Sequence, residues 1–182
     1  MTPDVILTPV DTSGADRLAL VELLTTHEFP FHVVPRPQRE DVERRLASGG
    51  FDDEDHASFW LDAAPVGRLG LVVLEDLTDD APLFDLRLAT EHRGQRWGVR
   101  ALRAITAHVF LTMPAVNRFE GQTREDNLAM RRTFRAAGFV QEAHYREGWP
   151  VPDGAPLGSV AYAILRRDWA TGTITPVPWG DG

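Results

Sequence analysis

The sequence predicts a single α/β or α+β domain. A chain of 182 residues suits one domain, and 43% hydrophobic with 25% charged residues is an ordinary globular composition. Helical segments come early, a meander of strands follows, and strands then alternate with helices. We expect this domain to span residues 1–169, with residues 170–182 as a C-terminal tail.

Each element is predicted from the spacing of its apolar residues and from the turn or capping residues at its ends. Apolar runs between turn residues predict strands at residues 5–10, 58–62, 66–77, 82–88, 118–123, 139–149 and 159–168. Apolar residues at helical spacing predict helices at residues 14–26, 38–47, 99–112 and 128–137. The last helix has Asp126 or Asn127 as N-cap and ends at Gly138. The stretch "HEFPFHVVPRPQRE" is broken by prolines and predicts a loop.

Composition excludes several functions. The net charge of −8 argues against broad nucleic-acid binding and weakly favours cationic partners such as amines. The chain has no cysteine, which excludes disulfides and thiol catalysis, and its histidines lack metal-ligand spacing, so we expect no metal. There is no membrane-length apolar run and no signal-peptide pattern, so we expect a cytoplasmic protein without membrane partners.

The stretch "EHRGQRWGVRALRAI", residues 91–105, predicts an anion site. A strand precedes it and a helix follows, and the first-turn N–H groups of a helix lack intrahelical partners. Gly94 and Gly98 allow close backbone approach, while Arg93, Arg96 and Arg100 add positive charge. The alternative is the solvated start of an amphipathic helix. An arginine-rich first turn is unfavourable beside the helix dipole, however, and a bound diphosphate would explain it.

Two nucleotide-binding folds are excluded by the same stretch. No lysine follows the glycine loop, as a P-loop requires, and "GQRWG" lacks the G-x-G-x-x-G pattern of a dinucleotide fold.

A second motif identifies the anion. "RFEGQTREDNLAMRRTFRAAGF", residues 118–139, together with the upstream "RGQRWG", resembles the GNAT superfamily of acetyl-CoA-dependent N-acetyltransferases. It looks closest to the ribosomal-protein-alanine N-acetyltransferase-like branch, whose signature "E-x-x-T-x-x-x-N-x-A-M-R" precedes a helix and "G-F". The ending "HYREGWPVPDG…SVAYAILRRDW" is also similar to that branch. The resemblance is specific over residues 83–169 and extends to residues 5–169 in element order.

The resemblance implies a fold and a cofactor site. The fold is a twisted, mainly antiparallel sheet of about seven strands flanked by about four helices, with strands 4 and 5 splayed apart to admit acetyl-CoA. The pantetheine arm would lie along the backbone of Leu86 and Leu88, and Asn127 would touch it, with helix N-capping as a compatible alternative role. The pyrophosphate would bind at Arg93, Gly94, Arg96, Trp97, Gly98 and Val99.

Arg96 departs from the family pattern, which has a glycine at this position. A residue with a side chain does not easily adopt positive φ. We therefore expect a less tight loop, in which the Arg96 guanidinium supplies a charge-assisted hydrogen bond to the pyrophosphate.

The implied reaction is direct acetyl transfer from a thioester to a primary amine, which must first lose a proton. Glu120 and Asp85 are the candidate bases, acting through water. The alternative is that each forms an ion pair, with Arg118 or Arg87, or faces solvent. Phe134 stands where many family members have a tyrosine acid, so we expect it to lie in the core instead.

The acceptor is a protein N-terminus or a small amine, and the sequence leaves the two open. His27 and His32 flank "EFPF" in a loop that borders the acceptor cleft in this fold, and Trp60, Tyr145 and Trp149 either line that cleft or belong to the core. A CoA-binding sensor or scaffold with little catalysis is the alternative function. The tail would dock on its own domain or on a second copy, which leaves a homodimer open.

Overall fold

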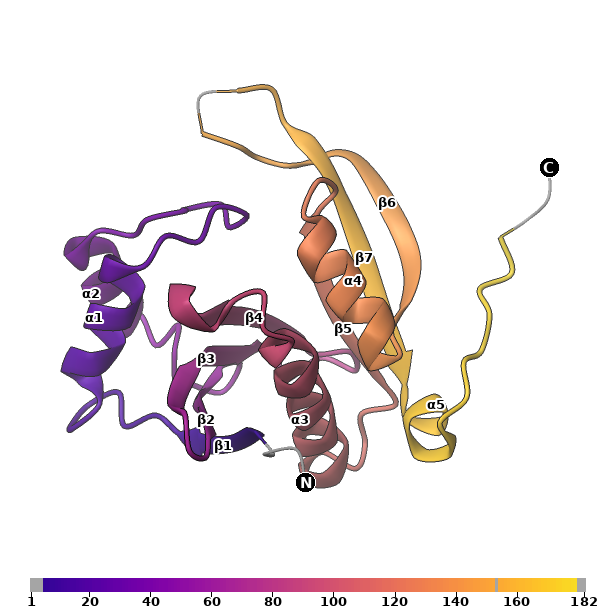
Figure 1. The fold of residues 1–182 in the computed structure, drawn as a ribbon, viewed down its shortest axis with the longest axis horizontal. Helices are drawn as coiled ribbons and strands as arrows, with labels where there is room; N and C mark the ends of the chain where they lie inside the picture. Colours follow the sequence, from indigo (N-terminus) through magenta and orange to yellow (C-terminus); the bar gives the residue numbers. More distant parts are fainter. Residues whose placement is uncertain (1–4, 153, 180–182) are drawn as a thin grey trace.

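Seven strands in two antiparallel sheets and five α-helices make up the part of the chain that the computed structural model describes, residues 5–152 and 154–179 (Figure 1). The strands are β1 (Val5–Pro9), β2 (Ala57–Ala63), β3 (Gly67–Glu75), β4 (Leu83–Leu88), β5 (Arg118–Arg124), β6 (Val140–Trp149) and β7 (Leu157–Leu165). The helices are α1 (Arg17–Thr26), α2 (Arg39–Ala47), α3 (Trp97–Thr112), α4 (Leu128–Ala137) and α5 (Arg166–Thr171), with a 3-10 turn at Thr90–His92. No described helix is long and apolar enough to cross a membrane.

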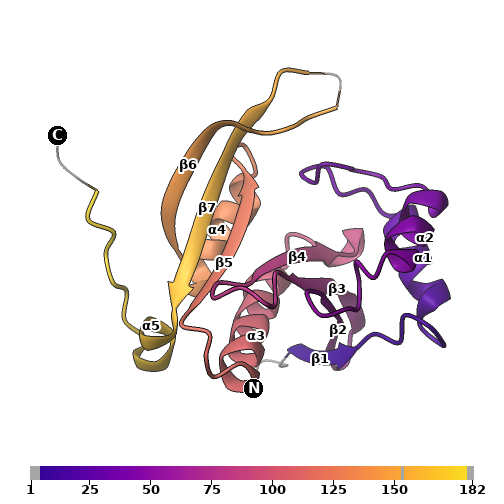
Figure 2. The same ribbon diagram turned by 180° about the vertical axis from the view of Figure 1, so that it is seen from behind.

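The two sheets separate between β4 and β5. One sheet has the order β1-β2-β3-β4 and the other β5-β7-β6, so β4 and β5 are edge strands that face each other across the gap. A backbone hydrogen bond from Glu120 N–H to the Pro82 carbonyl, at 3.1 Å, joins the sheets where they approach. Beyond it the strands diverge, as Figures 1 and 2 show from opposite sides. The predicted mainly antiparallel fold with a splay is confirmed.

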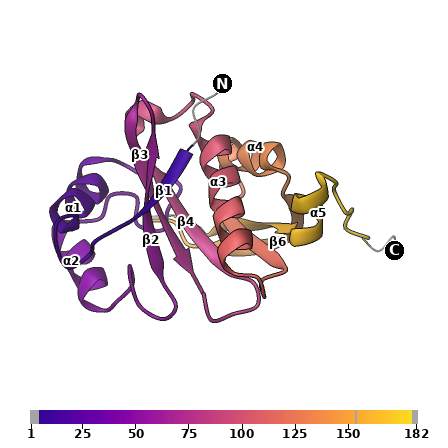
Figure 3. The same cartoon turned by 90° about the horizontal axis from the view of Figure 1, so that it is seen from below.

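Helices cover both faces of the first sheet. Seen from below, α1 and α2 lie on one side of β1–β4 and α3 on the other (Figure 3). The side chains of β3 alternate accordingly, because successive residues of a strand point to opposite faces. Leu71 and Val73 pack in the cluster with α1 and α2, whereas Val72 and Leu74 pack in the cluster with α3.

Phe134 of α4 lies in the core beneath the second sheet, as predicted. Its side chain is fully buried, and its ring stacks on that of Tyr162, with 4.7 Å between centroids and 3° between planes. Gly121 of β5 permits this packing, since a Cβ there would come within 2.7 Å of the Phe134 ring. Phe134 therefore has a packing role, and its side chain has no hydroxyl that could transfer a proton.

One element was predicted wrongly. The strand expected over residues 159–168 ends at Leu165, and Arg166–Thr171 forms α5. Asp168 of this helix is buried and accepts hydrogen bonds from the Thr175 backbone N–H and hydroxyl, at 2.9 and 2.8 Å. These bonds attach the first part of the C-terminal tail to the domain.

Candidate active site

A cavity of about 710 Å³ lies at the start of α3, and we call it the α3 cavity. The residues predicted for the cofactor that line it are Leu86, Leu88, Arg93, Gly94, Arg96, Gly98, Val99 and Asn127. They come from β4, from the loop before α3, from α3 itself and from the N-cap of α4. Trp97 is the exception, because its side chain is buried in the core. Of Trp97, only the backbone can bind an anion at the start of this helix.

The loop before α3 is tight, which corrects the expectation for Arg96. Arg96 has φ 65° and Gly94 has φ 73°, so both occupy the left-handed region that favours glycine. The surrounding structure holds Arg96 in this conformation at some cost in strain. Arg96 makes no side-chain capping hydrogen bond, which leaves the first-turn N–H groups of α3 without a capping side chain.

Arg93 is held by protein atoms. Its Nε donates to the Leu88 carbonyl at 2.9 Å and its Nη1 to the Glu28 carbonyl at 2.7 Å, and the guanidinium lies over the Phe29 ring. Arg93 thus ties β4 and the α1–α2 loop, residues 27–38, to the start of α3. Two of its three nitrogens are thus engaged by the protein, whereas Nη2 is buried without a hydrogen-bond partner among the described residues.

Asn127 caps α4 and also lies at the cavity. Its side-chain oxygen accepts a hydrogen bond from the Met130 N–H at 3.2 Å, and its Nδ2 donates to Thr123 Oγ1 at 2.9 Å. The capping role expected as the alternative is therefore present, and it fixes the side chain at the wall of the α3 cavity.

A second cavity of about 410 Å³ opens beside β4, and we call it the β4 cavity. The residues that line both cavities are Phe31, His32, Leu86, Asn127 and Met130. The α1–α2 loop reaches across the splay here. Arg124 of β5 donates a hydrogen bond to the carbonyl of Pro30 in this loop at 3.3 Å, and His32 of the loop bonds to Asp85 of β4. The two cavities therefore meet at the splay, beneath one loop.

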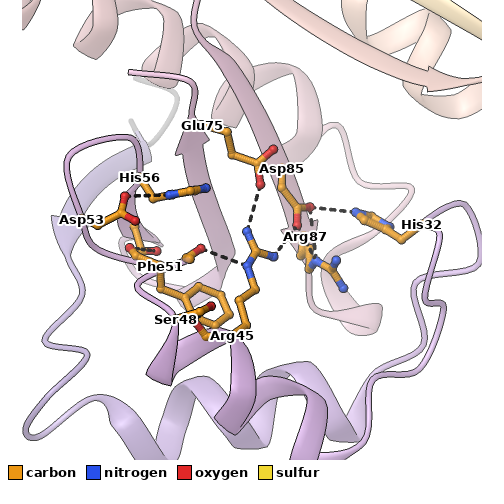
Figure 4. A network of polar contacts seen from close by, with 11 residues as sticks. His32, Arg45, Ser48, Phe51, Asp53, His56, Glu75, Asp85 and Arg87 are labelled. Atoms are coloured by element: carbon orange, nitrogen blue, oxygen red, sulfur yellow. Dashed lines mark hydrogen bonds and ion pairs between the residues drawn. The ribbon is translucent and has the colours of Figure 1, made fainter. Parts of the chain in front are cut away.

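Asp85 lies at the centre of a polar network on the wall of the β4 cavity (Figure 4). Its carboxylate bonds to Arg87 Nε at 3.1 Å, to His32 Nε2 at 2.9 Å and to Arg45 Nη1 at 3.4 Å. Burial alone would raise the pKa of Asp85, but the charges of Arg87 and Arg45 and the bond to His32 hold it well below its usual range. Asp85 is therefore a permanent anion with little tendency to take a proton. The ion pair with Arg87, expected as the alternative, is present.

Arg45 connects this network to Glu75 of β3. Arg45 Nη2 lies 2.9 Å from Glu75 Oε1, and Arg45 Nε donates to the Gly50 carbonyl at 2.9 Å. Burial and the neighbouring Asp85 raise the pKa of Glu75, while Arg45 opposes the shift. The network joins α2 to β3 and β4.

Glu120 lines neither of the two cavities. It bonds to Arg118 Nε at 2.9 Å, the ion pair expected as its alternative, and Arg118 also pairs with Glu142. Glu120 lines a third, open cavity of about 460 Å³, with Asp76, Asp79 and Asp80, and this cavity adjoins the β4 cavity at Leu83 and Gln122. This geometry does not bring it to the place where the α3 and β4 cavities meet.

The structure separates the aromatic and histidine candidates. His32 and Trp149 line the β4 cavity. His27 instead bonds to Thr90 Oγ1 at 3.2 Å. Trp60 is in the core, and Tyr145 is about half exposed on β6 and lines neither cavity.

Sequence reasoning missed one wall of the α3 cavity. The missed residues on α4 are Ala129, Arg132, Thr133 and Ala136. Their spacing of three, one and three residues places them on one helix face. That face is opposite the apolar side that holds Phe134. The helical spacing of these residues could therefore have predicted that they share one wall of the site.

Comparisons with known proteins concern the family and the fold of the chain. A family model described as an acetyltransferase (GNAT) domain matches residues 4–140. Among solved structures, the chain is similar to a spermidine N-acetyltransferase from Vibrio cholerae in complex with CoA and spermine, with TM-score 0.76, 16% identity, and coverage of 92% of this chain and 98% of that one. It is also similar to a GNAT-family acetyltransferase from Bacillus anthracis, with TM-score 0.72, 13% identity, and coverage of 92% and 98%. At these identities the structural likeness shows the fold alone. A sequence comparison with curated proteins finds no match.

Proposed function

The chain belongs to the GNAT acetyltransferase family, and from this premise we propose that it transfers the acetyl group of acetyl-CoA to a primary amine. The observation that supports the proposal is the shared wall of the α3 and β4 cavities. A donor lying in the first cavity and an acceptor lying in the second would meet beside His32 and Leu86. Holding the two reactants in this way accounts for a large part of such a rate enhancement.

The residues of the α3 cavity fit the chemistry of CoA. The uncapped first turn of α3 and the Arg96 guanidinium suit a pyrophosphate. A Cβ at Gly94 would meet no atom within 4 Å, so the approach to this loop is open. The edge of β4 offers backbone groups near Leu86 to an extended arm. When bound, acetyl-CoA would supply the acetyl thioester.

The β4 cavity suits an acceptor of modest size. The carboxylates of Asp85 and Glu75 in its wall are balanced by Arg87 and Arg45, so the wall is polar without a large excess of either charge. An amine must lose its proton before it attacks, since free α-amino groups have pKa values near 8 and lysine near 10.4. The candidate acceptors are a protein N-terminus, as the branch resemblance suggests, and a small amine.

Two measurements test the proposal. CoA should raise the melting temperature, because a ligand that binds only the folded state stabilises it by about 2.7 kcal/mol at a hundred times its Kd. Thiol release from acetyl-CoA should follow when peptides with free N-termini, amino acids or polyamines are added, and should be absent when the same peptides are N-acetylated. Absence of a thermal shift at millimolar CoA contradicts the proposal.

A CoA-binding module without catalysis remains the second candidate. It is favoured by Phe134, which occupies the position of the family's tyrosine acid and is fully buried. The departure from the family pattern at Arg96 does not favour it, because the loop keeps the tight conformation. A thermal shift with CoA and no thiol release with any amine would favour the module.

A further inference from the structure

His32 occupies the place where the two cavities meet. Its imidazole lines both the α3 and the β4 cavity. The loop that carries it is well held, because the His32 N–H donates to the Phe29 carbonyl at 3.0 Å and the Phe29 side chain is buried. The imidazole also packs edge-on against the Phe29 ring, with 5.6 Å between centroids. The ring is therefore positioned by its surroundings before any ligand arrives.

The bond to Asp85 determines which nitrogen of His32 carries the proton. The ionised carboxylate of Asp85 can only accept hydrogen bonds, and it lies 2.9 Å from Nε2. Nε2 must then be the donor in this contact. In the neutral imidazole, this leaves the lone pair on Nδ1.

Nδ1 has no partner in the protein. It is shielded from solvent, and residues 5–152 and 154–179 provide no hydrogen bond to it. A buried acceptor without a partner costs about 1–3 kcal/mol. His32 as a residue lines two ligand cavities although this atom is covered, so a bound donor such as an amine could complete it after a small movement of the ring or its neighbours. Catalytic hydrogen bonds are often formed only in the complex with substrate.

The other carboxylates near the site are less well placed than His32 to take the proton of the acceptor amine. Asp85 is held as an anion by Arg87 and Arg45, and Glu120 faces a different cavity in an ion pair with Arg118. Glu75 lines the β4 cavity and its pKa is raised by burial, but it does not line the α3 cavity, and Arg45 lies 2.9 Å from its Oε1.

We propose that His32 Nδ1 takes the proton of the acceptor amine, and that Asp85 is the positioning residue that orients the imidazole. The inference rests on the proposed acetyl transfer. An ammonium group gives one proton to Nδ1, and the resulting amine forms the new N–C bond with its lone pair. The C–S bond of the thioester breaks, the sulfur leaves with the bonding electrons, and it takes the second amine proton to become a thiol. His32 then releases its proton to solvent.

Several charged groups act on His32 and belong to its pH dependence. Asp85 and Arg87 face it from β4, while Arg45 of α2 and Glu75 of β3 act through Asp85. These four charges balance one another. Whether His32 causes a change in activity at low pH can therefore be decided only by replacing His32 itself.

The test compares His32→Gln with His144→Gln. His144 also bonds to a carboxylate, that of Glu125 at 2.8 Å, but it lines neither cavity. We expect His32→Gln to lower kcat/KM for the amine at least about a hundredfold, the usual contribution of a general base. The contribution of His32 to the fall in kcat/KM toward low pH should disappear in this variant, which leaves only the fall caused by protonation of the amine itself, and the thermal shift with CoA should be unchanged. His144→Gln should behave as the wild type in each respect.

A second measurement does not depend on activity. Nitrogen NMR of the imidazoles, assigned by the signal lost in His32→Gln, should show that the neutral tautomer of His32 carries its proton on Nε2. A proton on Nδ1 overturns the inference, and so does an unchanged kcat/KM and pH profile in His32→Gln. If the wild type binds CoA and acetylates an amine in those cases, the proposed function stands and only the role of His32 fails. A wild type that acetylates no amine overturns both.

Discussion

Arg93 and Arg96 stand three residues apart in one loop, yet their guanidinium groups have different surroundings. Arg93 is bonded to the carbonyls of Leu88 and Glu28 and lies over Phe29. Arg96 is exposed at the mouth of the α3 cavity and makes no capping bond. The first side chain therefore holds the loop in place, and the second is available for a phosphate.

Replacing the two residues by alanine should separate these roles. Arg96→Ala should weaken CoA binding about tenfold at low salt, the value of a charge-assisted hydrogen bond, and the loss should shrink as salt screens the charges. Arg93→Ala should lower the melting temperature, and its loss of CoA affinity should depend less on salt than the loss in Arg96→Ala. Calorimetric titration with CoA at two salt concentrations measures both effects.

Arg146→Ala provides the control for this pair. Arg146 is exposed on β6 and lines neither cavity, so its replacement changes the net charge by the same amount without touching the loop. Its CoA affinity should match that of the wild type. A salt-dependent loss in Arg93→Ala equal to that in Arg96→Ala would contradict the assignment.

At the scale of elements, α4 depends on its N-cap for both stability and position. Asn127 accepts the Met130 N–H, and its amide reaches Thr123 at the end of β5. Asn127→Ala should lower the free energy of unfolding by about 1 kcal/mol, the usual value of a lost cap. Asn127→Ser should recover most of this stability, because serine also caps. Urea denaturation measures the difference, and equal stability of the two variants would show that the cap is unimportant.

Local signals were enough to predict most of the elements. Helix α4 has a capping residue before it and Gly138, at φ 97°, after it, and its predicted bounds agree with the structure. The strands of the first sheet are apolar runs between turn residues, and they were found within a few residues of their true ends. The exception is α5. Its first residues, Arg166, Arg167 and Asp168, follow the apolar run of β7 directly, without a turn residue between them, and tertiary contacts such as those of Asp168 with Thr175 set the boundary.

At the scale of the whole molecule, the donor side of the candidate site was predictable and the acceptor side was not. Eight predicted residues line the α3 cavity because they are close in sequence to one loop and two helix starts. The β4 cavity is made by contacts between distant segments, such as His32 with Asp85, 53 residues away. An aperiodic loop gives no signal for where it will lie. The structure places the two candidate bases in ion pairs. His32 was expected from the sequence only as one of several residues near the acceptor cleft, and its contact with Asp85 is visible only in the folded chain.

The attachment of the N-terminal helices to the sheet depends on Arg45. This side chain of α2 bonds to Glu75 and Asp85 on two strands and to the Gly50 carbonyl, and it lies over the Phe51 ring. The network thus holds α2 and the α1–α2 loop at the distance from β4 that the β4 cavity requires. Removing its central cation should affect the stability of the whole domain.

Arg45→Met should lower the free energy of unfolding at pH 8 by about 2 kcal/mol, because it leaves buried carboxylates without their partner. The loss should be smaller at pH 5. The pKa of Glu75 is already raised by burial and by Asp85, and without Arg45 it rises further, so the folded variant takes up a proton that relieves the repulsion. A group with a raised folded-state pKa stabilises the protein at low pH and loses that contribution as pH rises through the folded pKa.

Arg44→Met is the matched control, since Arg44 is on the same helix, is largely exposed and pairs only at the surface with Asp41. Denaturation of both variants at the two pH values measures the free energy of unfolding. A loss of stability in Arg45→Met that is no larger at pH 8 than at pH 5 would contradict this role of Glu75.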